Sequence, residues 1–254
     1  MAGHSHWASI KHKKALVDAK RGKLWSKLAK AIIVAARIGG GDPDMNPRLR
    51  DAIDDAKSAG IPKDNILRAI KRGTGELEGE GNLESVVYEG YGPGGVAVLC
   101  EVLTDNRNRT APEIRKIFEL SDGKLGQSGS VAWMFETKGV FWIPQEKAQE
   151  DTLMEIALDA GADDVTRQED KFCITCDPSV FRTLAEKLQA AGIEPESKKV
   201  TLMPKTTLDI TDPDIARKIL KLMDRLDDHD DVQNVASNFN IPDQIMAQLA
   251  AESE

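Results

Sequence analysis

Cysteine, histidine and aromatic residues are scarce in this chain. Three cysteines and four histidines occur among 254 residues, and 5% of the residues are aromatic. A sparse and odd set of cysteines fits a reducing cytoplasm better than a disulfide framework. Cys173 and Cys176 have the spacing of redox and zinc sites, but residues three apart on an extended strand point to opposite faces. Because no second pair completes a zinc site, we predict two buried structural cysteines.

Long apolar runs are also missing. The longest candidate, LAKAIIVAARI, is interrupted by Lys30 and Arg37, so it falls short of the ~18 apolar residues that a membrane span needs. No hydrophobic region follows the basic N-terminus, so it does not look like a secretory signal. With 41% apolar and 30% charged residues, the composition is that of a globular protein. We expect a cytoplasmic protein with no membrane partner.

Recognisable catalytic motifs are absent as well. The globular body holds one histidine, no nucleophile-elbow motif and no pair of carboxylates with a recognisable partner. The glycine runs GGG and GYGPGG lack the strand and helix that flank a phosphate-binding loop, and we interpret them as turns. We therefore expect a protein that is not an enzyme and has no cofactor.

Charge is abundant, and it is unevenly distributed. The whole chain has a net charge of −8, but residues 1–73 carry 16 Lys and Arg against 7 Asp and Glu, a net charge of +9. The remaining residues carry 18 basic against 35 acidic side chains, a net charge of −17. This asymmetry indicates an electrostatic task for the basic end, which attracts phosphate while the acidic body repels it.

Apolar periodicity predicts an all-helical module over residues 1–75. Apolar positions recur at helical spacing from Leu24, and this helix should end at the GGG run. A second helix is predicted for residues 47–59, capped by Asn46, and a third for residues 62–72.

After the linker GTGELEGEGN the pattern changes to strands and helices. Strands are expected in ESVVYEGYG, GVAVLCEVLTD and GSVAWMFET, with a helix in TAPEIRKIFELSDG. Residues 139–204 have the order β-α-β-β-α-β of a ferredoxin-like domain. The earlier strands then need a helix and a strand from DPDIARKILKLMDRLDD and DDVQNVASNF. The predicted fold is α+β with three domains, residues 1–75, a discontinuous α/β domain of 82–138 plus 205–240, and the inserted 139–204, with antiparallel sheets in both α/β domains.

Several longer stretches follow one another along essentially the whole chain. They are MAGHSHWASIKHKKALVDAKRGK, GGGDPDMNPRLRDAI, PKDNILRAIKRG, YEGYGPGGVAV, LTDNRNRT and LGQSGSVAWMF. Together they resemble the YebC family, although His6 stands where a lysine is usual. The resemblance implies one helical and two α/β domains in a cytoplasmic regulator of gene expression. Bacterial members are named probable transcriptional regulatory proteins with DNA binding assigned, whereas mitochondrial members activate translation, which implies ribosome-associated action.

The basic segment has the chemistry of a phosphate-binding arm. From Lys11 to Arg37, nine cations stand against one carboxylate, Asp18. Each phosphate that they neutralise would release condensed counterions, and Trp7 and the imidazoles could stack on unpaired bases. The residues predicted to bind nucleic acid are His4, Ser5, Trp7, Lys11, His12, Lys13, Lys14, Lys20, Arg21, Lys23, Lys27, Arg68, Lys71 and Arg72.

The nature of the nucleic acid stays open between DNA and ribosomal RNA. A flexible basic tail suits RNA with unpaired bases, whereas duplex reading asks for a rigid helix in the major groove. Residues 47–59 and 62–72 resemble a helix-turn-helix only weakly. We expect a monomer with nucleic acid, and in the RNA case the ribosome, as partner. The alternative is an acidic scaffold that binds a protein partner, with the basic arm auxiliary.

A second candidate region follows the second expected strand, in the segment TDNRNRT. Alone, this segment is typical of a capped helix start. The resemblance makes it a candidate functional loop, formed by Tyr88, Glu89, Tyr91, Asn106, Arg107, Asn108 and Arg109.

No metal site is expected. His229 lies in the acidic run DDHDD, and hard cations bind such carboxylates. We favour a solvated loop with at most loose cation pairing. The histidines near the N-terminus have lysines as neighbours, which disfavour a divalent metal ion.

Overall fold

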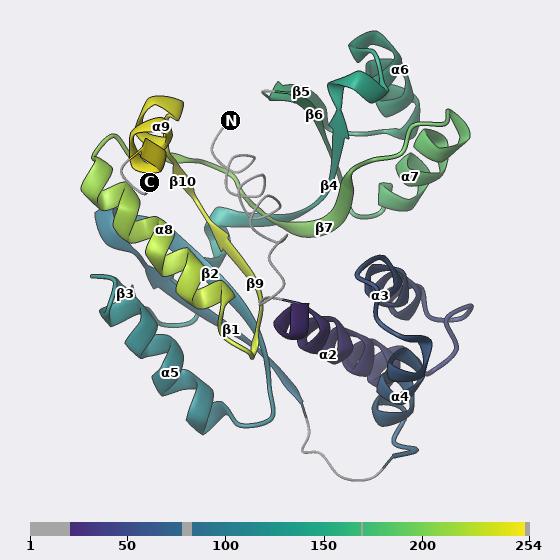
Figure 1. Ribbon diagram of the computed structural model, residues 1–254, viewed down its shortest axis with the longest axis horizontal. Coiled ribbons are helices and arrows are strands. Elements are labelled where there is room, and N and C mark those ends of the chain that lie inside the picture. The colour runs from purple at the N-terminus through teal and green to yellow at the C-terminus, as the bar shows by residue number, and fades with distance from the viewer. Residues whose placement is uncertain (1–20, 78–82, 169, 252–254) are drawn as a thin grey trace. The chain divides into compact units, whose positions relative to one another are not determined.

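The computed structural model describes residues 21–77, 83–168 and 170–251, without the side chains of residues 21–23, 47 and 250–251 (Figure 1). The fold is α+β, as predicted, and the described chain divides into two compact units. One unit holds the described residues up to Ser130 together with Pro213–Val235, and the other holds Val131–Asp212 and the described residues from Ala236. The three domain boundaries proposed from the sequence stay a prediction.

The helical module consists of α2 (Arg21–Gly39), α3 (Pro47–Ser58) and α4 (Lys63–Gly73), which confirms the three predicted helices. Asn46 caps α3 as predicted, because its side chain accepts a hydrogen bond from the backbone N–H of Leu49 at 3.1 Å. Pro62 precedes α4 in place of opening it.

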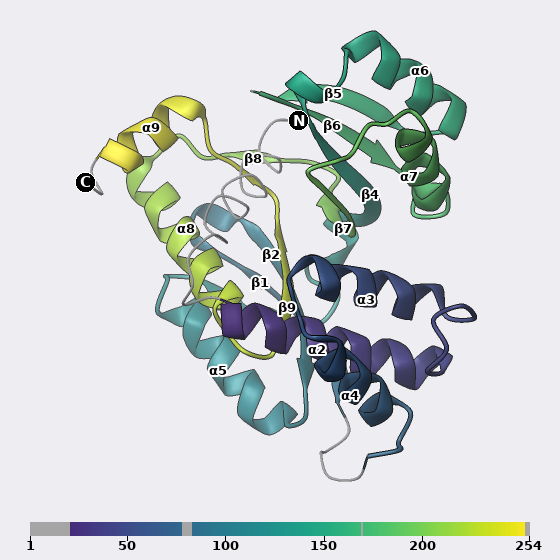
Figure 2. The ribbon, with the colours of Figure 1, turned by 45° about the vertical axis from the view of Figure 1, so that its right-hand side comes forward.

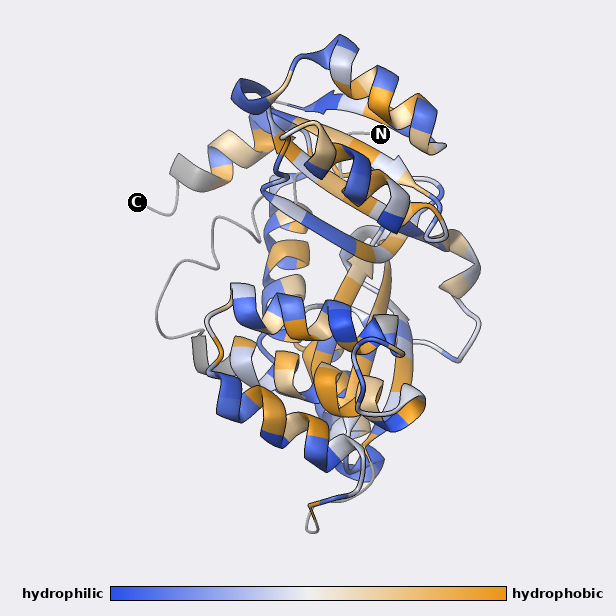
Figure 3. Ribbon diagram, turned by 90° about the vertical axis from the view of Figure 1, so that its right-hand side faces the viewer, coloured by the Kyte–Doolittle hydropathy of each residue, from blue (hydrophilic) through white to orange (hydrophobic). Residues whose placement is uncertain are grey.

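The module has its own apolar core. The helices carry hydrophobic and hydrophilic residues in alternation along the ribbon, as expected for amphipathic helices (Figure 3). Ile32 and Leu49 are fully buried in this core and Ile66 is 6% exposed. At Gly73, α4 crosses α2 so closely that an added Cβ would lie 2.5 Å from the backbone oxygen of Ile33. Apolar packing and a glycine contact therefore hold α4 in place.

The same unit contains an antiparallel sheet in the order β3-β1-β2-β9. Its strands are β1 (Glu84–Tyr91), β2 (Ala97–Thr104), β3 (Lys124–Leu125) and β9 (Val232–Ser237). Two helices, α5 (Arg107–Glu119) and α8 (Pro213–Asp227), pack against each other and on this sheet. An added Cβ at Gly90 would meet Phe118 of α5 at 2.7 Å, and one at Gly92 would meet Leu222 of α8 at 3.0 Å. As predicted, α8 and β9 return to the sheet begun by β1 and β2.

The second unit has ferredoxin-like topology, as predicted. The elements that form this topology are β4 (Phe135–Pro144), α6 (Glu150–Ala160), β5 (Asp164–Gln168), β6 (Lys171–Cys176), α7 (Phe181–Ala190) and β7 (Ser197–Pro204). The sheet order is β5-β6-β4-β7 and every pairing is antiparallel. Phe141, Ile174, Leu153 and Leu184 join the sheet to the two helices in one core.

Three features differ from the prediction or were absent from it. The strand expected in residues 129–137 is correct only for Phe135–Thr137, because Ala132–Met134 forms a 3-10 turn and Phe135 begins β4. The short β3 supplies the third strand before the insertion. Two short strands, β8 (Leu208–Asp209) and β10 (Phe239–Asn240), and a final helix, α9 (Asp243–Ala251), were not predicted.

The two CxxC cysteines are buried, as predicted. Cys176 belongs to the core beneath the helices, whereas Cys173 packs with Val140 and Trp142 on the other side of the sheet. Burial raises the pKa of Cys173 to about 12 and that of Cys176 to about 11. Since a thiolate is the nucleophile, these buried thiols are weak nucleophiles at neutral pH.

None of the helices that the structure describes combines the length and the apolar character that a membrane crossing requires.

Candidate nucleic-acid interface

Most of the predicted arm lies outside the described residues. This applies to His4, Ser5, Trp7, Lys11, His12, Lys13, Lys14 and Lys20. Arg21 and Lys23 belong to the first turns of α2, but their side chains are not described. The described candidates are therefore Lys27 on α2 and the cations of α4.

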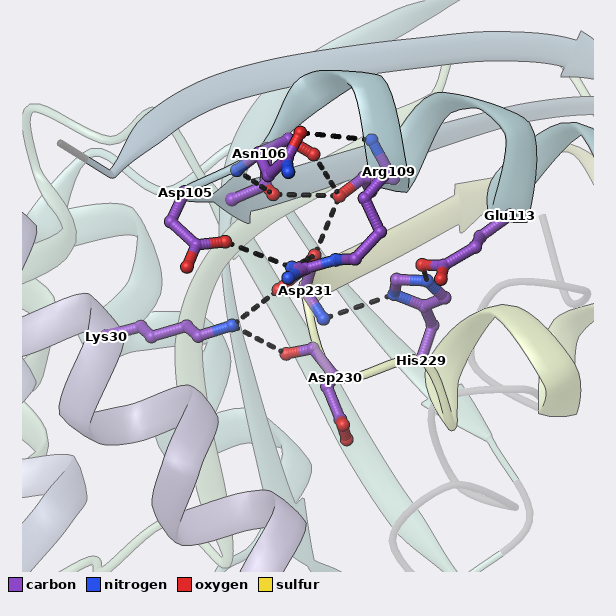
Figure 4. A network of polar contacts seen from close by, with 10 residues as sticks. Lys30, Asp105, Asn106, Arg109, Glu113, His229, Asp230 and Asp231 are labelled. Atoms are coloured by element: carbon purple, nitrogen blue, oxygen red, sulfur yellow. Dashed lines mark hydrogen bonds and ion pairs between the residues drawn. The ribbon is translucent and has the colours of Figure 1, made fainter. Parts of the chain in front are cut away.

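Lysines on α2 reach an acidic loop at the end of α8. The ammonium of Lys27 donates to the backbone oxygen of Asp227 and lies 3.4 Å from its carboxylate. One turn further along, Lys30 donates to a carboxylate oxygen of Asp231 at 2.7 Å and to the backbone oxygen of Asp230 at 3.1 Å (Figure 4). The side chain of Lys27 is 14% exposed and that of Lys30 is 19% exposed, so most of the surface of both side chains is buried.

Asp231 is the centre of this polar network. Its side chain is 5% exposed, and its other carboxylate oxygen accepts hydrogen bonds from Arg109 and Thr110, each at 2.8 Å (Figure 4). Burial alone would raise the pKa of this carboxyl. The hydrogen bonds from Lys30, Arg109 and Thr110 outweigh burial and hold the pKa below its ordinary value. Asp231 is therefore a buried anion that Lys30 and Arg109 neutralise and Thr110 hydrogen-bonds.

His229 completes the loop. Its Nδ1 accepts a hydrogen bond from the backbone N–H of Asp231 at 3.2 Å, so the ring proton of the neutral form lies on Nε2. That nitrogen is 3.0 Å from the carboxylate of Glu113 on α5. The prediction of a solvated loop is wrong for Asp231, and the cations that this acidic loop holds are the side chains of Lys27, Lys30 and Arg109. No group of ligands suited to a metal occurs among the described residues.

The TDNRNRT segment forms the start of α5. Asn106 caps this helix by accepting a hydrogen bond from the backbone N–H of Arg109 at 3.1 Å. The guanidinium of Arg109 bonds Asp105 at 3.0 Å as well as Asp231. Arg107 is 3.8 Å from Glu84, and Asn108 is exposed. The segment therefore has a structural task, because it supplies Arg109 to the buried carboxylate.

The three other residues of the candidate loop do not form one site. On β1, Glu89 and Tyr91 alternate with Tyr88 and so point to the opposite face of the sheet. The carboxylate of Glu89 is buried and accepts the backbone N–H of Gly129 at 2.6 Å. The hydroxyl of Tyr91 donates to the backbone oxygen of Ser130 at 3.0 Å. Burial raises the pKa of Tyr88, which nearby Arg107 partly opposes.

The cations of α4 face solvent. Lys63, Arg68, Lys71 and Arg72 are exposed. Ile66, Ala69 and Gly73 of the same helix are buried in the core. Within the described part of the chain, the first three of these cations have no hydrogen bond or ion pair. Their charge is therefore available to an anion from outside the chain.

Comparison with known proteins identifies the family. Residues 5–76 match the TACO1/YebC protein N-terminal domain, and residues 83–239 match the TACO1/YebC second and third domain. The chain belongs to the TACO1/YebC family. The resemblance found in the sequence is thereby confirmed.

Two relatives and one solved structure match the chain over nearly its whole length. A probable transcriptional regulatory protein of Rhodopirellula baltica is 54% identical over 249 residues, covering 98% of this chain and 100% of that protein. One of Halothermothrix orenii is 54% identical over 254 residues, covering 99% and 100%. The crystal structure of a conserved hypothetical protein from Aquifex aeolicus, 50% identical, superposes with a TM-score of 0.84 and covers 93% of this chain and 97% of that one.

Lys30, Thr110 and Asp231 were not predicted as site residues. Their network joins parts of the chain that are 201 residues apart for Lys30 and Asp231, and 121 residues apart for Thr110 and Asp231. The signal available in the sequence was charge, since a segment rich in lysine needs carboxylates wherever it packs. The acidic run around His229 was the strongest candidate for that partner.

Proposed function

We propose that this protein is a non-enzymatic regulator of gene expression that binds nucleic acid through its N-terminal helical module. The observation that carries the proposal is that Lys63, Arg68 and Lys71 on α4 are unpaired within the described chain, since cations without a carboxylate partner can bind phosphate. The names of the curated relatives, probable transcriptional regulatory proteins, support a regulatory role. We further propose that it acts in the cytoplasm as a monomer.

RNA is the target that we favour over DNA, with ribosomal RNA and the ribosome as the proposed partners. The remaining residues carry a net charge of −17 and repel phosphate, so nucleic acid cannot wrap around the whole protein. Limited contact with an irregular RNA surface suits this charge distribution. Helix α4 is short, and the cations Lys63 and Lys71 lie at its two ends. Such an arrangement contacts backbone phosphates more readily than base edges in a major groove.

A binding titration tests the phosphate contacts. The full chain and an Arg68→Gln/Lys71→Gln variant would be titrated against a labelled RNA and the DNA of the same sequence at several salt concentrations. We expect the variant to bind about tenfold more weakly and to reduce the slope of log affinity against log salt by about 1 to 2. Lys57→Gln is the matched control, because Lys57 is 64% exposed but is paired with Asp54.

A crosslinking experiment in cells tests the choice of target. RNA and DNA bound to the wild type and to the Arg68→Gln/Lys71→Gln variant would be sequenced. Enrichment of ribosomal RNA that the variant loses supports translation control. Promoter DNA without ribosomal RNA would support the transcriptional role that the relatives' names give. If the variant retained all nucleic-acid binding and deletion of residues 1–23 changed nothing, the acidic scaffold would replace the proposal.

A further inference from the structure

The loop between α2 and α3 is built as a rigid projection. Asp42 forms an Asx turn, because its carboxylate accepts the backbone N–H of Asp44 at 2.9 Å and its backbone oxygen accepts that of Met45 at 3.3 Å. Arg50 of α3 donates to the backbone oxygens of Pro43 and Asp44, both at 3.0 Å. Figures 1 and 2 show this loop extending beyond the ends of the helices that it joins.

The other end of the loop is equally fixed. The side-chain amide of Asn46 is buried and donates to the backbone oxygens of Ala35 and Gly40, each at 2.9 Å. Met45 therefore lies between an anchored turn and an anchored helix cap. Its side chain is nevertheless 80% exposed, and Ile38 at the end of α2 is 69% exposed. Single exposed apolar residues are common, so what lies beside them decides their meaning.

The loop adjoins a face of α4 that carries free cations. An added Cβ at Gly41 would lie 2.8 Å from Thr74 and 3.2 Å from Ile70, so the start of the loop packs against the C-terminal end of α4. Lys63, Leu67 and Lys71 recur at four-residue intervals and form the adjoining stripe of the same helix. Leu67 is 44% exposed, and neither lysine is paired within the described chain.

We infer that this surface, formed by the α2–α3 loop and the Lys63–Leu67–Lys71 stripe, binds unpaired nucleotides of an RNA. The two lysines contact phosphates, and Met45 and Leu67 contact the faces of bases that are not stacked in a duplex. Asp42 and Asp44 repel phosphate from the tip of the loop, which leaves Met45 for a base. The inference rests on the proposed function and adds to it that the bound nucleotides are unpaired and that apolar side chains contact their bases.

Charge and shape favour this occupant over a protein groove. A hydrophobic groove on a protein would gain little from lysines spaced along the helix. Proteins that bind single strands combine a basic track with side chains, most often aromatic, on which the bases pack, and Met45 and Leu67 take that place here. A duplex offers phosphates but keeps its bases stacked, so it uses the lysines and not Met45. The two kinds of contact can therefore be separated by the choice of probe.

The experiment compares one single-stranded probe with its duplex. The full chain would be titrated by fluorescence anisotropy with a labelled RNA of about 20 nucleotides without self-pairing, alone and annealed to its complement. We expect Met45→Ser and Leu67→Ser each to weaken single-strand binding about fivefold to tenfold and duplex binding less than twofold. Met45→Tyr should bind the single strand at least as tightly as the wild type, because a tyrosine ring stacks on bases.

Leu158→Ser is the matched control, since Leu158 on α6 is 83% exposed and carries no part of the proposed surface. Circular dichroism and thermal unfolding of each variant would show that the fold is kept. Equal losses on single strand and duplex, or no loss with Met45→Ser and Leu67→Ser, would overturn the inference while leaving the proposed function intact. If the wild type bound neither probe, the proposed function itself would fail. If Met45→Ser instead removed a protein partner in a pull-down, with RNA affinity unchanged, the surface would be a protein docking site.

Discussion

Helices α2 and α4 both carry several lysines or arginines, but the surroundings of these cations differ. Lys27 and Lys30 on α2 are engaged by the loop after α8, and both are less than one-fifth exposed. Lys63, Arg68 and Lys71 on α4 are exposed and have no partner within the described chain. The same residue types therefore serve two purposes, to join segments of the protein and to attract an anion from outside.

The difference matters for binding because a paired lysine brings no net charge to a ligand. Phosphate would have to displace Asp231 from Lys30, whereas it would displace only counterions from α4. Other exposed cations, such as Lys116 on α5, also lack a side-chain partner within the described residues. Helix α5 also carries Glu113 and Glu119, while α4 has Asp64 as its single carboxylate. Whether a lysine or arginine can bind phosphate therefore depends more on the nearest carboxylate than on its position in the basic segment.

The largest expected effect follows from removing the anion that holds α2. Asp231→Ala would leave Lys30, Arg109 and Thr110 without their shared acceptor in a largely buried site, and we expect the free energy of unfolding to fall by about 3 kcal/mol. Urea denaturation measures the change. Asp230→Ala is the control, because its side chain is exposed and should cost less than about 0.5 kcal/mol. A smaller loss for Asp231→Ala than for Asp230→Ala would refute this account of the network.

The same carboxylate predicts how stability depends on pH. Because the folded protein holds the pKa of Asp231 below its ordinary value, the unfolded chain binds a proton at a higher pH than the folded chain does. This contribution is complete above pH ~5 and is lost progressively as the pH falls through ~3.9, the ordinary value for Asp, toward the lowered pKa. Denaturation at pH values from neutral to acidic should show a shallower loss of stability in Asp231→Asn than in the wild type. Parallel curves would mean that Asp231 does not contribute to acid sensitivity.

Local signals in the sequence were sufficient for most of the fold. The apolar spacing on α2, the cap at Asn46 and the alternation on β6 each depend on neighbours a few residues away. Cys173 and Cys176 were placed on opposite faces of a strand by the same reasoning, because side chains alternate along any extended chain.

Features that depend on distant partners could not be found in this way. The segment around Trp133 looks like a strand by composition, yet Ala132–Met134 turns, and β-propensity yields to tertiary context. The burial of Asp231 depends on Lys30 and Arg109, which reach it from other segments of the chain. A local pattern of acidic residues predicts solvent exposure, and only the folded chain shows that donors surround one of them. The sequence was therefore sufficient to predict that the candidate site is basic. It was not sufficient to predict which of its cations are paired with carboxylates of the same chain.

A smaller effect is expected from the lysine on the other side of the network. Lys30→Gln removes one charged donor but leaves Asp231 bonded to Arg109 and Thr110, so we expect a loss of about 1 to 2 kcal/mol in the free energy of unfolding. The salt slope of RNA binding should stay within experimental error of the wild type, since Lys30 is already paired. A reduced slope at unchanged stability would show that Lys30 binds phosphate after all, and the contrast with α4 would collapse.

Lys71→Gln should show the reverse behaviour and the smallest change in stability. Because Lys71 is exposed and unpaired within the described chain, its loss should alter the free energy of unfolding by less than about 0.5 kcal/mol. RNA affinity should nevertheless fall by about threefold to fivefold, with a salt slope lower by about 0.7 to 0.9, the amount expected for one lost phosphate contact. Anisotropy titrations at several salt concentrations and urea denaturation of the same sample measure both quantities. Stability lost at Lys30 and affinity lost at Lys71 would separate the two purposes of the cations, because neither variant alone distinguishes a weakened fold from a weakened interface.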